Sequence, residues 1–121
     1  MAEITTGDML LLPFPPSANR YWRHAKGRTY ISKQALDYRA AVAASTSRKV
    51  PLKGELAVKL SFDYPDKRKR DLDNLCKQVL DAMQHAGVYE DDSQIVQLLL
   101  VRNSIVDRDS AECLVLIEVV E

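Results

Sequence analysis

Residues 55 to 86 constrain the fold most strongly, because two different hydrophobic periods follow one another there. Between Glu55 and Asp63, apolar residues occupy every second position, which predicts a half-buried strand. These residues are Leu56, Val58, Leu60 and Phe62. Between about Asp73 and Ala86, apolar residues recur at helical spacing, and Gly87 follows where a helix typically ends. That stripe consists of Leu75, Val79, Leu80, Met83 and Ala86.

The other predicted elements are shorter or less regular. Ser32 is a plausible N-cap for a helix whose apolar side could include Leu36 and Val42, and Gly27 lies at the bend of a predicted hairpin. The predicted ranges are a strand at 9–14, the hairpin at 21–32, a helix at 33–47, and strands at 94–106 and 112–120. This order predicts an α+β fold with a mixed, largely antiparallel sheet and two main helices, and residues 1–121 form a single domain in this interpretation.

Composition limits the functional class. No apolar run is long enough to cross a bilayer, and the N-terminus has no secretory pattern, so we expect a cytoplasmic protein without a membrane partner. The net charge is zero, which argues against a simple basic nucleic-acid binder. However, residues 1–77 carry 15 Lys and Arg against 8 Asp and Glu, and residues 78–121 carry 2 against 9. This uneven distribution predicts a basic face and an acidic face, unless folding mixes the two.

A charged tract joins the predicted strand to the predicted helix. Lys67, Arg68, Lys69 and Arg70 run directly into Asp71 and Asp73. Two carboxylates two residues apart project to one side of an extended chain but diverge by about 200° on a helix. They can therefore chelate a metal only where the chain enters the helix. The alternative is that Asp73 caps the helix and Asp71 interacts with its positive end.

Two further residues extend this site. Asp92 follows the helix, and a helix of about 14 residues spans about 21 Å, so geometry permits a third ligand without requiring one. Otherwise Asp91 and Asp92 belong to a solvated turn. Lys77 lies one turn after Asp73, where a cation can stabilise a phosphate in the transition state. The alternative is an ordinary salt bridge from Lys77 to Asp73 or Asp81.

Basic residues accompany these carboxylates. The predicted hairpin region contributes Arg20, Arg23, Lys26 and Arg28, and the tract contributes Lys67 to Arg70. Such residues bind phosphates without reading sequence, although the tract could also be a solvated loop or a localisation patch. Hard carboxylate oxygens suit Mg²⁺ or Mn²⁺. The combination predicts metal-assisted hydrolysis of a nucleic-acid phosphodiester.

Several short motifs, in order over about residues 10 to 100, resemble the RusA-like Holliday-junction resolvases. They are Pro-Pro-Ser-Ala-Asn-Arg at 15–20, Arg-Asp-Leu-Asp-Asn-Leu at 70–75, Lys77, and Asp91-Asp92. The resemblance implies a homodimeric endonuclease, often of prophage origin, that cuts four-way junction DNA with Mg²⁺ or Mn²⁺. It implies that Asp71, Asp73 and Asp92 bind the metal and that Lys77 is catalytic. The neutral charge departs from what such a binder needs and predicts weak or salt-sensitive affinity.

Other functions are compatible with the same residues. The chain could be a branched-DNA-binding protein without catalysis, an enzyme acting on a small phosphorylated substrate, or a structural subunit. For the dimer, the last two strands are apolar on both faces, so one face packs on the helices and the other needs a second cover. The alternative is that one helix covers each side of the sheet and the chain is a monomer.

Overall fold

A four-stranded mixed sheet carries both main helices. The computed structural model describes residues 7–16, 22–25, 27–46 and 50–120, with the backbone alone for 22–25 and 28–30. The sheet order is β1-β6-β4-β5. β6 pairs antiparallel with β1 and β4, whereas β4 and β5 are parallel. The bounds are β1 Gly7–Pro13, β2 Trp22–Ala25, β3 Arg28–Ile31, α2 Lys33–Ala44, β4 Leu56–Tyr64, α3 Leu72–His85, η1 Asp92–Gln94, β5 Ile95–Ile105 and β6 Glu112–Val119. The predicted α+β class is confirmed.

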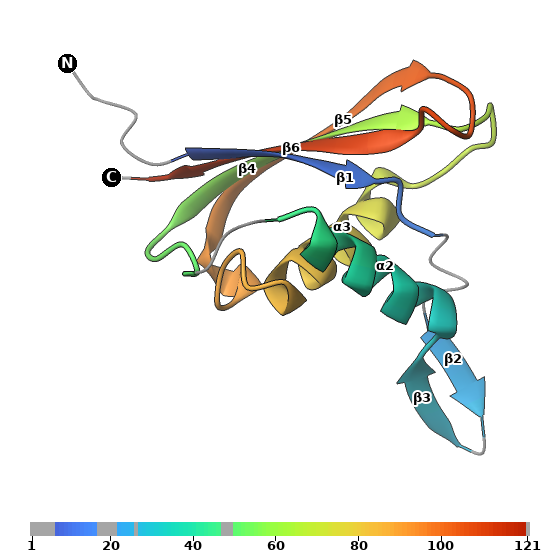
Figure 1. Cartoon of the computed structure of the whole chain (residues 1–121), viewed down its shortest axis with the longest axis horizontal. Helices are drawn as coiled ribbons and strands as arrows, with labels where there is room; N and C mark the ends of the chain where they lie inside the picture. The colour runs from blue at the N-terminus through green and yellow to red at the C-terminus, as the bar shows by residue number, and fades with distance from the viewer. Residues whose placement is uncertain (1–6, 17–21, 26, 47–49, 121) are drawn as a thin grey trace.

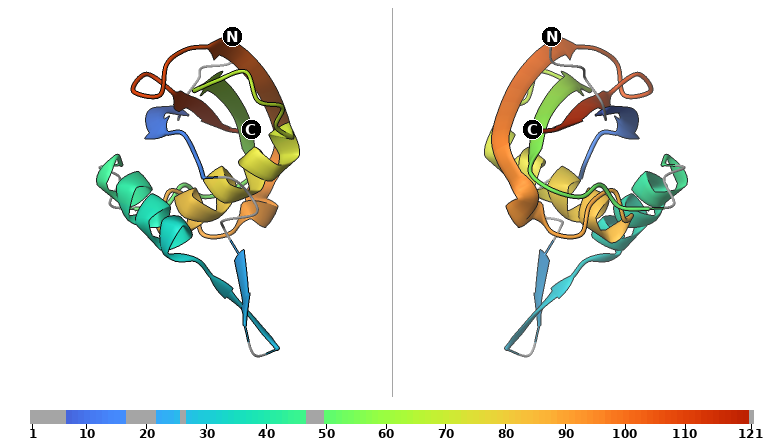
Figure 2. Two further views of the ribbon diagram at one scale, coloured as in Figure 1. Left: turned by 90° about the vertical axis from the view of Figure 1, so that its right-hand side faces the viewer. Right: turned by 90° about the vertical axis from the view of Figure 1, so that its left-hand side faces the viewer.

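Both helices lie on the same side of the sheet (Figures 1 and 2). The alternative with one helix on each side is therefore wrong. The predicted alternation in β4 is confirmed, because its four apolar residues from Leu56 to Phe62 are all buried. They pack in one core with residues of α2, α3 and the other strands, including Val42, Val79, Met83 and Val115. Burial of this inner face holds the helices on the sheet.

Local signals define the helix ends. The Ser32 hydroxyl accepts a hydrogen bond from the Ala35 N–H at 3.2 Å, which confirms the predicted N-cap of α2. At the end of α3, Gly87 has a φ of 79°, and the Val88 N–H donates to the Met83 carbonyl at 3.0 Å. This is the Schellman arrangement, in which a left-handed residue satisfies the last helical carbonyls.

The predicted apolar face of α2 needs correction. Leu36 was assigned to it, but its side chain is half exposed. The buried positions are Ala35, Tyr38 and Val42. Tyr38 was missed because its burial depends on a distant partner for its hydroxyl, which donates to the Pro13 carbonyl at 2.9 Å. This bond ties α2 to the end of β1.

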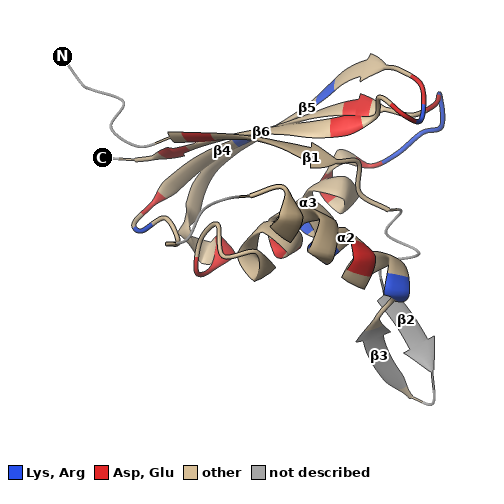
Figure 3. Cartoon of the chain, viewed as in Figure 1, with Lys and Arg blue, Asp and Glu red and all other residues tan. Residues whose placement is uncertain are grey.

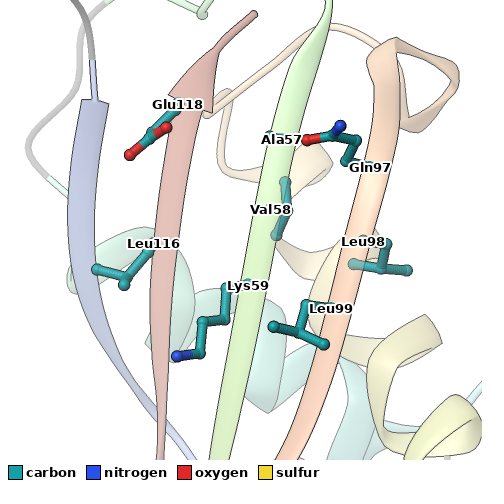
Figure 4. Close-up of a pocket in the computed structure, with 8 residues that line it drawn as sticks. All are labelled: Ala57, Val58, Lys59, Gln97, Leu98, Leu99, Leu116 and Glu118. Carbon is teal, nitrogen blue, oxygen red and sulfur yellow. The ribbon is translucent and has the colours of Figure 1, made fainter. Parts of the chain in front are cut away.

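The outer face of the sheet and the edge strand β5 are exposed. Four large apolar residues of β5 are at least 44% exposed: Val96, Leu98, Leu99 and Ile105. On the outer face, the register places Met9, Leu116, Lys59 and Leu99 in one row across the four strands. Figure 4 shows Leu116, Lys59 and Leu99 lining a depression of about 310 Å³ on this face. The sheet therefore presents an apolar surface on the side opposite its helices.

The predicted hairpin consists of β2 and β3, with Gly27 at its bend in a left-handed conformation. It extends from the start of α2 away from the sheet (Figure 2). The described part of the chain contains no helix with the length and apolar character needed to span a bilayer.

Candidate metal centre and phosphate-binding cleft

Asp71 and Asp73 lie where the chain enters α3. Asp71 is the N-cap residue with extended backbone angles, and Asp73 is in the first helical turn. The Asp71 side chain makes no capping hydrogen bond; instead, Oδ2 accepts from Asn74 Nδ2 at 3.4 Å. Both aspartates are exposed. The condition set for a chelating pair, a position at the helix entry, is thus met, and two exposed carboxylates fit the oxygen preference of Mg²⁺.

Lys77 follows on the exposed side of α3. Among the residues that the structure describes, it forms no ion pair with either aspartate considered for it. Asp81 instead binds Arg39 of α2, whose Nη2 lies 2.8 Å from Asp81 Oδ2. This ion pair joins the two helices. Lys77 is therefore available one turn from Asp73 to interact with a phosphate.

The two aspartates of the pair at 91–92 have different roles. Asp91 caps η1, because its carboxylate accepts from the Ser93 N–H at 2.9 Å, and this bond lowers the pKa of Asp91. Asp92 is held through its backbone, whose N–H donates to Gln84 Oε1 at 3.1 Å. The Gln94 side chain fastens the same turn, since it donates to the carbonyls of Leu52 and Gly54. Capping thus occupies the Asp91 carboxylate, and the turn fixes the position of Asp92.

Within one chain, Asp92 lies far from the other two carboxylates. Asp71 precedes α3 and Asp92 follows it, and a helix of 14 residues spans about 21 Å. The pairing of β4 with β5 also places Asp71 and Asp92 at opposite ends of the sheet. Ile95, just after η1, pairs with Leu56 at the start of β4, whereas Asp71 follows the end of β4. No three potential metal ligands cluster anywhere in the described ranges.

A cleft of about 640 Å³ adjoins Asp71. It is bordered by the end of β1, the first turn of α2, the start of α3, the charged tract and the turn between β5 and β6. The side chains that line it include Pro15, Pro16, Gln34, Arg68, Lys69, Asp71, Asn74 and Arg108. Arg68 and Lys69 are exposed. A concave surface with cations beside carboxylates can hold a phosphate next to a metal site.

The predicted phosphate-binding residues that are described lie in different parts of the structure. Lys67, Arg68 and Lys69 form an exposed basic loop between β4 and α3 (Figure 3), whereas Arg70 turns inward. Arg20 and Lys26 lie outside the described residues. Arg23 and Arg28 lie on β2 and β3, where the backbone alone is described. Because β3 leads directly into α2, and Gln34 lines the cleft, the base of the hairpin adjoins the cleft.

The sequence analysis missed several residues of the cleft. Arg108 lies between two aspartates in the turn after β5, and the fold brings this turn beside Arg68 and Asp71. Asp66 follows the end of β4, and its carboxylate binds Arg70. The i, i+4 spacing of Asp66 and Arg70 was the available signal for this pair. No local pattern indicated Arg108, because its position depends on the packing of β5 and β6.

Comparison with known proteins identifies the class. The sequence profile described as "Endodeoxyribonuclease RusA" matches residues 13–118. Two relatives named crossover junction endodeoxyribonuclease RusA, from Escherichia coli K12 and Enterobacteria phage 82, are 38% and 40% identical over 96 residues, covering 77% of this chain and 80% of each relative. A third, from Enterobacteria phage HK97, is 42% identical over 76% of this chain and 79% of its own length. The chain belongs to the RusA endodeoxyribonuclease family.

Proposed function

We propose that this chain is an endodeoxyribonuclease that cuts four-way DNA junctions with Mg²⁺ or Mn²⁺. The observation that carries the proposal is the pair of exposed carboxylates at the entry of α3, beside a cleft with exposed cations, in a member of this family. The relatives are named for action at crossover junctions. We also propose action in the cytoplasm, where the DNA of bacteria such as the source of one relative is located.

The residues of the site have different roles in the proposed reaction. Asp71 and Asp73 would hold the metal ion, which would supply Lewis-acid activation of the scissile phosphate and the attacking water. Lys77, one turn further along α3, offsets negative charge on the phosphate in the transition state. Arg68 and Lys69 hold a neighbouring phosphate in the cleft, which orients the backbone for attack without reading bases.

A synthetic four-way junction tests this function. We expect paired cuts near the branch point with Mg²⁺, none with a chelator, and no cutting of a linear duplex of the same sequence. Tight junction binding without metal-dependent cuts would establish the alternative, a non-catalytic branched-DNA-binding protein. Equal cutting of duplex and junction would contradict the proposed selectivity.

We further propose a homodimer built around β5. This strand is one of the two edges of the four-stranded sheet, is 11 residues long and exposes large apolar side chains. An uncovered strand of this kind invites association with another chain. Lys59 and Glu118, which line the adjoining depression, have opposite charges and so suit a self-complementary contact (Figure 4). A two-fold dimer also matches the near two-fold symmetry of the junction, which needs two cuts.

The direction of β5 links this dimer to Asp92. β4 and β5 are parallel, Asp71 follows the end of β4, and Asp92 precedes the start of β5. A two-fold axis across the middle of β5 sets the two copies of this strand antiparallel. The start of one β5 then lies at the end of the other, so the second copy brings its Asp92 toward Asp71. In this proposal Asp92 is the third carboxylate of its partner's site.

Mixing two inactive variants tests this arrangement. Asp71→Asn and Asp92→Asn are co-folded in equal amounts and assayed for nicking of a cruciform plasmid. If Asp92 acts in the partner's site, the mixed dimer contains one complete site, and single nicks return. If all three carboxylates act within one chain, the mixture stays inactive. Asp71→Asn mixed with Asp73→Asn is the matched control, because no complete site can form.

A further inference from the structure

Arg70 differs from the other cations of its tract. Its side chain is 20% exposed, compared with 76% for Arg68. Its guanidinium makes two hydrogen bonds to one carboxylate: Nη1 donates to Asp66 Oδ1 at 2.8 Å and Nη2 to Asp66 Oδ2 at 3.2 Å. This two-pronged pairing fixes the orientation of the guanidinium as well as its position.

Two aromatic rings also contact the Arg70 guanidinium. The guanidinium carbon lies 5.4 Å from the ring centre of Phe14 and 5.4 Å from that of Tyr64. These distances are typical of cation–π contacts. The two rings meet edge to face at 5.7 Å, and Phe14 also meets the buried Phe62 at 6.2 Å. Arg70 therefore joins the chain after β1 to the end of β4.

Asp66 closes the loop that Arg70 anchors. Besides binding Arg70, its Oδ1 accepts from the Arg68 N–H at 2.9 Å. The hydrogen bonds from the Arg70 side chain and the Arg68 backbone lower the pKa of Asp66 to about 2. The carboxylate is thus charged at neutral pH, and residues 66–70 form a closed loop whose last member directly precedes Asp71.

We propose that Arg70 is a positioning residue, which fixes the backbone of Asp71 at the entry of α3 and does not bind phosphate. The inference rests on the function proposed above. Asp71 needs an outside anchor because its side chain makes no capping bond and its backbone is extended. A carboxylate misplaced by about 1 Å can cost about a hundredfold in rate. The exposed neighbours Arg68 and Lys69 are left to contact DNA.

The experiment compares four variants with the unsubstituted protein. Arg70→Gln removes the charge and the paired bonds, Arg70→Lys keeps the charge alone, and Asp66→Asn weakens the carboxylate partner. Lys69→Gln is the matched control, since it removes one cation from the adjacent position in the same cleft. For each, we measure single-turnover cleavage with excess protein, junction affinity against salt, Mn²⁺ affinity by calorimetry, and amide hydrogen exchange at residues 71–75.

Positioning predicts one pattern for both members of the anchor. Arg70→Gln, Arg70→Lys and Asp66→Asn should all lower the saturated cleavage rate by about a hundredfold, weaken Mn²⁺ binding and speed amide exchange at 71–75. Their salt dependence of junction binding should stay close to that of the original protein. Lys69→Gln should instead reduce the log–log salt slope by about 0.9 and leave Mn²⁺ affinity and amide exchange at residues 71–75 unchanged.

A phosphate-contacting Arg70 predicts different results. Arg70→Lys would then retain activity, Arg70→Gln would lose about 0.9 of the salt slope like the control, and Asp66→Asn would bind DNA more tightly and cut normally. Any of these three results overturns the proposal. If Arg70→Gln does not fold, the partly exposed Asp66→Asn provides the test. Amide exchange and Mn²⁺ affinity do not need cleavage, so an original protein that cuts no junction refutes the proposed function separately.

Discussion

Replacing Leu99 with glutamine should weaken the proposed homodimer. Leu99 of β5 is 56% exposed in the single chain. Fully burying a leucine is worth about 1.5–3 kcal/mol, so covering the remaining fraction is worth about 0.8–1.7 kcal/mol. A two-fold interface contains this residue twice, which gives about 1.7–3.4 kcal/mol. At about 1.4 kcal/mol per tenfold, the dimer dissociation constant should rise by between about 15-fold and 300-fold.

Sedimentation equilibrium from nanomolar to micromolar concentration measures this constant. The matched control is Leu36→Gln on α2, because Leu36 is 50% exposed and lies on the helical side of the molecule. About half of each leucine is buried in the single chain, so on the same scale each substitution should lower the unfolding free energy by a similar amount, about 0.7–1.5 kcal/mol. Equal dissociation constants for the Leu99 variant and the original protein would refute the placement of the interface at β5.

Four more outcomes follow from the site and the core. Asp71→Asn should abolish Mg²⁺-dependent cutting while junction binding in gel shifts stays equal or tightens, because a repelling charge is lost; ordinary cutting would remove Asp71 from the site. Lys77→Ala should lower the single-turnover rate at least a hundredfold but change stability by less than about 1 kcal/mol, and a normal rate would exclude catalysis by Lys77. Arg108→Ala should reduce the log–log salt slope of binding by about 0.9, and an unchanged slope would place Arg108 away from DNA. Ser32→Ala should cost about 1 kcal/mol in urea unfolding through the lost α2 cap, whereas unchanged stability would show that the cap contributes little.

Local physics explains why most elements could be predicted from the sequence. The alternation in β4 and the stripe in α3 each reflect one buried face, which the structure contains. Ser32 and Gly87 identify helix ends because each solves a local hydrogen-bonding problem at the terminus. The entry position of Asp71 was also indicated by its sequence neighbours, since Pro65 and the charged tract favour extended backbone up to that point.

The unpredicted features depend on residues distant in sequence. Whether the helices share one side of the sheet depends on strand order, and β5 pairs parallel with β4 while β6 enters on the other side. Tyr38 is buried because its hydroxyl reaches Pro13, 25 residues earlier. Arg70 belongs to a run of four cations that look equivalent, yet the rings of Phe14 and Tyr64 select it alone for an inward position.

The three predicted ligand residues show how far a motif can be interpreted. Asp71 and Asp73, together with Lys77, lie within two turns of one helix, so their proximity follows from sequence alone. Asp92 belongs to the same motif, but β4 runs from its neighbourhood towards that of Asp71 and α3 runs back, so the length of both elements separates the two residues. Elements this regular cannot shorten by the length of a helix. If Asp92 is a ligand, its carboxylate must therefore come from a second chain. A complete metal site then forms only in the dimer.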